Sequence, residues 1–151
     1  MNEKKNLTIE ETFALAVQNH RKNNLKVAQN LYKKILKTNP NYVGVYYNLG
    51  ITYKELEEYQ KAISCYEKAI QINPNYAGAY FNLANILQES RELQKAKSCY
   101  EKLLNLDPTY KKGYSGYGNL LLKITQHSKG LAYIRKGDGV IRFTQKDVQI
   151  V

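Results

Sequence analysis

Asn48 and Asn82 stand 34 residues apart, and each directly follows an aromatic residue, Tyr47 or Phe81. A side-chain amide offers two donors and one acceptor oxygen, so it can pair with both the N–H and the C=O of an extended backbone. The neighbouring ring adds apolar contact area at a low cost in side-chain entropy. The combination predicts a surface that binds a peptide. We place on it Phe13, Val17, Tyr47, Asn48, Ile51, Phe81, Asn82, Asn85, Lys112 and Asn119.

A helix is the element that would bring these residues to one side. Around Asn48, a stripe of apolar residues with the spacing i, i+3, i+4, i+7 predicts the core-facing side of a helix, and it consists of Tyr46, Leu49, Gly50 and Tyr53. The binding residues form a second stripe, turned by about 100° from the first. Since the first stripe meets the needs of core packing, the second needs another explanation. Hydrogen bonding of the asparagines to neighbouring helices is the simpler alternative.

The whole pattern repeats along the chain. The only three prolines, Pro40, Pro74 and Pro108, are spaced by 34 residues, and the letters SCYEK occur at 64–68 and again at 98–102. A fixed period of this length is typical of stacked supersecondary units. We therefore divide the chain into units 9–42, 43–76 and 77–110, and a degenerate fourth unit with a closing helix, 111–136.

Each unit is predicted to be a helical hairpin. In the second unit the first stripe ends near Glu57, and a second apolar stripe starts at Tyr59 and continues through Ala62 and Tyr66. Small residues such as Gly50 and Ala62 allow the two helices to approach closely. The proline near the end of the unit cannot continue a helix and disfavours helical geometry in the residue before it.

These residues resemble the tetratricopeptide repeat family. The second unit carries the family signature as Tyr46, Leu49, Gly50, Tyr53, Ala62, Tyr66, Ala69 and Pro74, and the third as Tyr80, Leu83, Ala84, Leu87, Ala96, Tyr100 and Pro108. The first unit is degenerate, and in the fourth Gly130 replaces the alanine. The resemblance covers roughly 9–136. It implies an all-α fold, a right-handed solenoid of antiparallel helix pairs.

The ends of the chain fall outside this pattern. Residues 1–8 form an N-terminal tail, and Gly137 and Gly139 are expected to stop the last helix. We expect an irregular C-terminal tail over 137–151, although Val140 to Phe143 have strand-like content. This tail either folds back on the last helix or leads into a further domain.

The resemblance implies that the second stripe lines a concave groove that holds an extended peptide or a partner helix. Asn48 and Asn82 would form a ladder of asparagines along such a peptide, and a similar ladder is known in the repeat domain of O-linked N-acetylglucosamine transferases. The carboxylate clamp of chaperone adaptors is not expected here. Phe13, Val17, Tyr47 and Ile51 stand where its first lysine and asparagine are needed, and Lys112 could donate only one contact.

No catalytic arrangement is recognisable in the sequence. Paired carboxylates, a Ser/His/Asp set and a Cys/His pair at a suitable spacing are all missing, so we do not expect an enzyme and assign no cofactor. His20 and His127 are expected to be solvated near helix ends. Cys65 and Cys99 occupy equivalent places in two units and are interpreted as small packed thiols, with neither a disulfide nor a metal site.

The charge of +10 is unevenly distributed. Residues 1–40 carry eight Lys or Arg against three acids, residues 41–110 seven against eight, and residues 111–151 eight against two. Basic ends favour acidic partners. Only four of the 23 basic residues are arginines, which argues against nucleic acid. The sequence contains neither a membrane-spanning run nor an apolar stretch ahead of Glu10 and Glu11, so we expect a cytoplasmic location.

Three alternatives stay open at this point. The leading prediction is a scaffold or adaptor that binds protein partners. The second is an N-terminal substrate-recruiting domain of a larger enzyme, a glycosyltransferase or an oxygenase. Nucleic-acid binding is the third, and it would weaken steeply with salt. Self-association through an incompletely capped end is also open.

Overall fold

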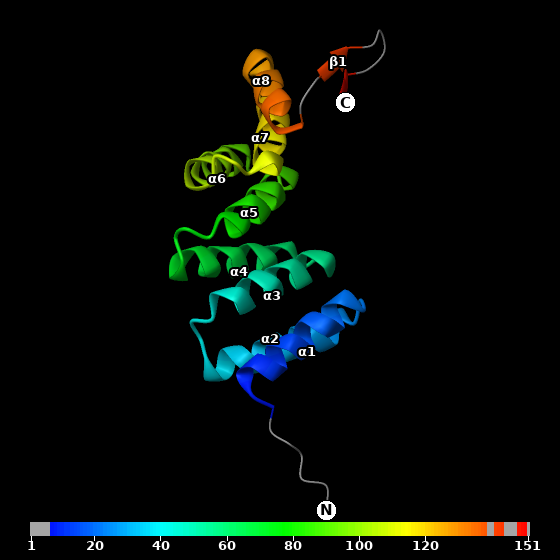
Figure 1. Cartoon of the computed structure of the whole chain (residues 1–151), viewed down its shortest axis with the longest axis vertical. Coiled ribbons are helices and arrows are strands. Elements are labelled where there is room, and N and C mark those ends of the chain that lie inside the picture. The colour runs from blue at the N-terminus through cyan, green and yellow to red at the C-terminus, as the bar shows by residue number, and fades with distance from the viewer. Residues whose placement is uncertain (1–6, 139–140, 144–147, 151) are drawn as a thin grey trace, which may run out of the picture. The chain divides into compact units, whose positions relative to one another are not determined.

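A computed structural model describes residues 7–138, 141–143 and 148–150 (Figure 1). Eight helices follow one another along its described part, and the chain divides after Pro74 into two compact units. The first unit contains α1 (Ile9–Arg21), α2 (Leu25–Thr38), α3 (Val43–Glu55) and α4 (Tyr59–Ile72). The second contains α5 (Ala77–Glu89), α6 (Leu93–Leu106), α7 (Lys111–Lys123), α8 (His127–Asp138), β1 (Ile141–Phe143) and β2 (Val148–Ile150). The expected helical hairpins are present as the pairs α1–α2, α3–α4, α5–α6 and α7–α8.

The turn inside each hairpin has the same geometry. Its central residue has a positive φ of 59–65° and is Asn23, Glu57, Arg91 or Thr125. The next N–H bonds back to a carbonyl five residues earlier, as from Glu58 to Tyr53 at 2.9 Å. This is the Schellman arrangement, which normally favours glycine at the left-handed position. One of these turns confirms the predicted break near Glu57.

The core of each of the first three 34-residue repeats is built from a small residue and a large ring at equivalent positions. Ala28, Ala62 and Ala96 are fully buried on the second helices. Tyr32, Tyr66 and Tyr100 follow them by four residues and are also fully buried. The rings fill the space that the small residues leave between paired helices, and this is the pattern that the sequence predicts.

The last pair, α7 and α8, packs most closely at glycines. A Cβ atom on Gly118 would lie 2.7 Å from the backbone oxygen of Gly130, and a Cβ on Gly137 would lie 2.7 Å from the backbone oxygen of Lys111. The expectation that Gly137 stops the last helix was therefore wrong. Gly137 belongs to the helix, which continues to Asp138, because the missing side chain permits contact with α7.

Two short strands follow α8. β1 and β2 pair antiparallel with Ile141 opposite Ile150, and β1 lies within the stretch of strand-like content. Both strands fall in the tail that was expected to be irregular. Among the residues that the structure describes, no helix combines the length and the apolar character needed to cross a bilayer.

Candidate peptide-binding surface

The predicted binding residues all lie on the first helix of a hairpin. In the first unit α1 and α3 carry Phe13, Val17, Tyr47, Asn48 and Ile51; in the second unit α5 and α7 carry Phe81, Asn82, Asn85, Lys112 and Asn119. The side chains of this set are half-buried, except for those of Lys112 and Asn119, which are exposed. Half-burial suits residues that are fixed by their neighbours and still present some surface to a ligand.

Tyrosines inside each unit hold the aromatic members in place. The ring of Phe13 stacks on Tyr42, with centroids 5.4 Å apart, and also meets Tyr32 at 6.0 Å. In the second unit the ring of Phe81 lies 5.2 Å from that of Tyr110. Part of the apolar surface of Phe13 and Phe81, which we predicted to contact a ligand, therefore packs against tyrosines of the same unit.

The four asparagines differ in the hydrogen bonds they make. Asn48 donates from Nδ2 to the carbonyl of Gly44 on its own helix, at 2.7 Å, and its oxygen accepts no hydrogen bond from the described residues. Asn82 and Asn119 have no hydrogen-bond partner among the described residues. Asn82 is the more informative of the two, because a half-buried amide without a partner is costly unless a ligand or water satisfies it.

Asn85 has the structural role that the simpler alternative describes, a hydrogen bond to a neighbouring helix. Its Oδ1 accepts a hydrogen bond of 2.6 Å from the hydroxyl of Tyr100 on α6, which leaves only its NH₂ group for a ligand. The sequence contained one signal for this contact. Asn85 occupies the position that Val17 has in the first repeat and Ile51 in the second. The third repeat alone therefore offers a polar partner to its buried tyrosine.

The corresponding tyrosines of the first unit lack such a partner. The hydroxyl oxygens of Tyr32 and Tyr66 are buried and make no hydrogen bond with any residue that the structure describes. Burial disfavours the charged phenolate, which raises the pKa of Tyr32 to about 12 and that of Tyr66 further above its usual range. These two rings therefore contribute packing, and their hydroxyls remain neutral.

A side-chain hydrogen bond joins the two hairpins of the first unit. Nε2 of His20 on α1 lies 2.6 Å from Oε2 of Glu55 on α3, and the histidine side chain is 16% exposed. The expectation that His20 is solvated was therefore wrong: its place at the end of α1 brings it beside the next hairpin. Lys26 and Glu58 form a second link between α2 and the start of α4, at 3.1 Å.

The described residues contain no cluster of three or more His, Cys, Asp or Glu side chains that could hold a metal ion. Both cysteines are free thiols. Cys65 is buried, which raises the pKa of its thiol to about 11 and keeps it protonated. This agrees with its interpretation as a packing residue.

Two family models match the chain, and both describe the tetratricopeptide repeat. One covers residues 43–76, the second of the predicted 34-residue repeats, and the other covers residues 65–98. A comparison with curated protein sequences found no match.

Solved structures agree with the family assignment. A crystal structure of MamA is 25% identical with a TM-score of 0.81, over 86% of this chain and 76% of that one. A MamA RS-1 double mutant is 22% identical with a TM-score of 0.79, over 89% and 74%. MamA residues 41 to the end from Desulfovibrio magneticus RS-1 are 21% identical with a TM-score of 0.78, over 85% and 73%. The last two show the fold alone. The family models thus show tetratricopeptide repeats over residues 43–98, and the helical hairpins and these solved structures agree with a tetratricopeptide repeat fold.

Proposed function

We propose that the first helices of each unit form a binding half-site for an extended peptide or a partner helix. The general role, a protein-interaction scaffold, is the one that the repeats and their structural neighbours support. The finer proposal adds a surface. In the first unit it uses Phe13, Tyr47 and the free oxygen of Asn48, and in the second it uses Phe81 and Asn82.

The observation that carries the proposal is the free amide of Asn82. Its side chain is half-buried beside Phe81, whose ring is held against Tyr110, and the described residues offer the amide no partner. A peptide backbone could satisfy the donors and the acceptor of that amide together. The simpler alternative, hydrogen bonding to a neighbouring helix, explains Asn85, but it leaves Asn82 without a role, and the bond of Asn48 lies within its own helix.

A peptide array with purified protein tests this proposal. We expect the Asn48→Ala/Asn82→Ala variant to bind selected peptides about tenfold more weakly, because each lost amide removes hydrogen bonds of about 0.5–1.5 kcal/mol. Asn30→Ala is the matched control, since Asn30 is an exposed asparagine of α2 outside the surface. Thermal melting followed by circular dichroism checks that all variants stay folded.

The alternatives predict other outcomes of the same array. If the double variant binds as well as Asn30→Ala, the asparagines are structural and the half-site proposal is wrong. If binding disappears for all variants as salt rises, the basic residues bind acidic material without selecting a sequence. Peptide binding by an amide-and-aromatic surface should instead depend only weakly on the salt concentration.

A further inference from the structure

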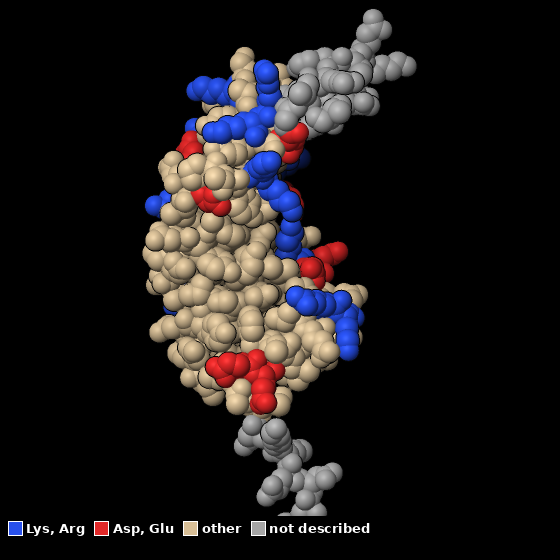
Figure 2. Space-filling model, in the orientation of Figure 1, with Lys and Arg blue, Asp and Glu red and all other residues tan. Residues whose placement is uncertain are grey.

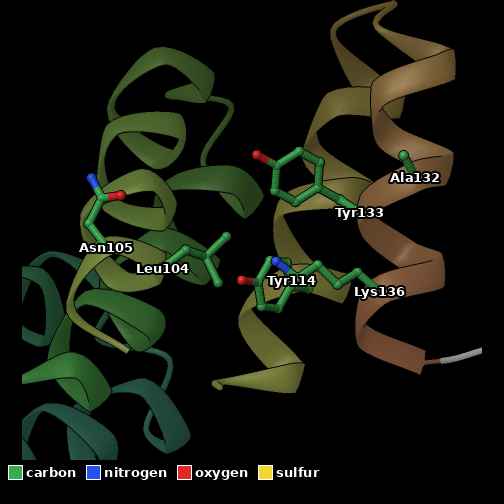
Figure 3. A pocket seen from close by; sticks show the side chains of 6 residues that line it. All are labelled: Leu104, Asn105, Tyr114, Ala132, Tyr133 and Lys136. Carbon is green, nitrogen blue, oxygen red and sulfur yellow. The ribbon is translucent and has the colours of Figure 1, made fainter. Parts of the chain in front are cut away.

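A cavity of about 290 Å³ lies in the second unit (Figure 3). Leu104 and Asn105 of α6 line one side, Ala132, Tyr133 and Lys136 of α8 line the other, and Tyr114 of α7 lies between them. None of these six residues belongs to the surface discussed above. We call this cavity the α6–α8 pocket.

The two tyrosine rings that line the pocket are held in place. The rings of Tyr114 and Tyr133 stack at 5.9 Å, with 29° between their planes. The Tyr114 hydroxyl donates to the carbonyl of Pro108 at 3.0 Å, and Tyr133 meets Tyr117 edge-on at 4.8 Å. Two aligned rings beside the Leu104 side chain present an aromatic and aliphatic wall. Such a wall suits a flat apolar group, because rings gain from offset or edge contacts as well as from burial.

The mouth of the pocket carries a cation and an amide. The Nζ atom of Lys136 lies 4.1 Å from the centroid of the Tyr114 ring, and no carboxylate of the described residues lies within 4.0 Å of it. The Asn105 side chain has no hydrogen-bond partner in the part of the chain that the structure describes. The nearby carboxylate of Asp138 instead accepts a hydrogen bond from Ser115. One positive charge and one amide are thus available at the edge of an apolar wall.

The surroundings strengthen the positive charge. Residues 111–138 contain Lys111, Lys112, Lys123, Lys129, Arg135 and Lys136 against the single acid Asp138. Figure 2 shows Lys and Arg side chains gathered over this end of the second unit. A cleft bounded by one sign of charge attracts the opposite sign. The complementary ligand therefore carries a carboxylate beside its apolar group.

We propose that the α6–α8 pocket receives an aromatic side chain of a partner polypeptide, with a neighbouring Asp or Glu paired to Lys136. The aromatic and aliphatic walls take the ring, and Lys136 takes the carboxylate. The ligand is part of a polypeptide because the rim is open: Asn105, Ala132 and Lys136 are all exposed, whereas sites for free small molecules bury most of the ligand. This contact is separate from the first-helix half-sites and can exist without them.

Titration of the isotope-labelled protein with capped peptides tests the proposal. The probes are short Gly/Ser peptides that contain a Phe-Asp, Phe-Asn or Ala-Asp pair, and the readout is the backbone amide shift of Asn105, Ala132, Tyr133 and Lys136. We expect the Phe-Asp peptide to move these resonances, the Phe-Asn peptide to bind several-fold more weakly and the Ala-Asp peptide to bind least.

Variants of the protein locate the contact. Lys136→Met keeps the aliphatic stem but removes the ammonium group, so the Phe-Asp peptide should bind about tenfold more weakly while the Phe-Asn peptide is unchanged. Lys129→Met is the matched control, because Lys129 is an exposed lysine of α8 that does not line the pocket. Removing that charge should change binding less than about twofold.

Equal losses in the two lysine variants would overturn the proposal, since only the overall charge would then matter. Binding of phenylacetate at the same residues without binding of the peptides would overturn the polypeptide ligand. If Lys136→Met fails to fold, Asn105→Asp decides, because it places a repelling charge at the exposed rim and should also weaken Phe-Asp binding about tenfold. The Asn48→Ala/Asn82→Ala variant should bind these probes normally, so this proposal and the half-site proposal fail separately.

Discussion

The second and third repeats bury the same tyrosine and treat its hydroxyl group differently. Tyr66 and Tyr100 are both fully buried and stand 34 residues apart. Within the described part of the chain the Tyr66 hydroxyl has no partner, whereas that of Tyr100 donates to Asn85 at 2.6 Å. The first helix of the second repeat offers Ile51 at the position of Asn85. The repeat therefore requires the ring, and the hydrogen bond is an addition made in one copy.

A second difference lies beside these rings. A Cβ atom on Gly50 would lie 2.6 Å from Cε1 of Tyr66, so that ring rests directly on the backbone of α3. The third repeat has Ala84 at this position. The second repeat thus gains close packing by having no side chain, while the third accepts a methyl group and adds a polar contact. Substitutions in each repeat can measure how much the close packing and the hydrogen bond each contribute to stability.

The largest effect is expected for Gly50→Ala. The added Cβ must displace a buried ring, and overpacking of this kind costs about 1–3 kcal/mol, so we expect the free energy of unfolding to fall by about 2 kcal/mol. Urea denaturation measures it. Gly44→Ala on the same helix is the control, because its Cβ would come no closer than 3.3 Å to the Tyr42 ring. Equal stability of the two variants would show that Tyr66 moves freely.

A smaller loss is expected for Tyr100→Phe. The variant removes the donor that pairs with Asn85 and leaves the half-buried amide oxygen unsatisfied, which costs about 1–2 kcal/mol. The comparison is with Tyr66→Phe, measured by the same denaturation. If both phenylalanine variants lose the same stability, the hydrogen bond adds nothing and the two repeats differ only in their packing.

Much of the fold could be predicted from the sequence, because it depends on local periodicity. The prolines and the apolar stripes at equivalent positions were sufficient for the helical hairpins and the breaks between helices. The left-handed turns could not be predicted from residue types, since Glu57, Arg91 and Thr125 stand where glycine is preferred. The Schellman bonds that close these turns hold them in that geometry.

The candidate sites were harder to predict, because they depend on contacts between helices. The spacing placed Asn82 and Asn85 on one side of a helix, but only the packing of α6 shows that Asn85 serves Tyr100. Gly137 was interpreted as a stop signal, although its role is set by the approach of α7. The α6–α8 pocket combines side chains of three helices, and none of them forms a motif along the chain.

The smallest effect is expected for Tyr66→Phe at neutral pH. Removing a buried hydroxyl without a partner should change the free energy of unfolding by less than about 0.5 kcal/mol, or raise it. Burial raises the pKa of Tyr66 above the value of about 10 expected in the unfolded chain, so the unfolded state loses this proton first as pH rises. Wild-type protein should therefore lose stability above pH 10 by about 1 kcal/mol more than Tyr66→Phe at pH 11. A difference between the two that stays constant from pH 7 to pH 11 would mean that the hydroxyl ionises equally in both states and is hydrated in the folded protein.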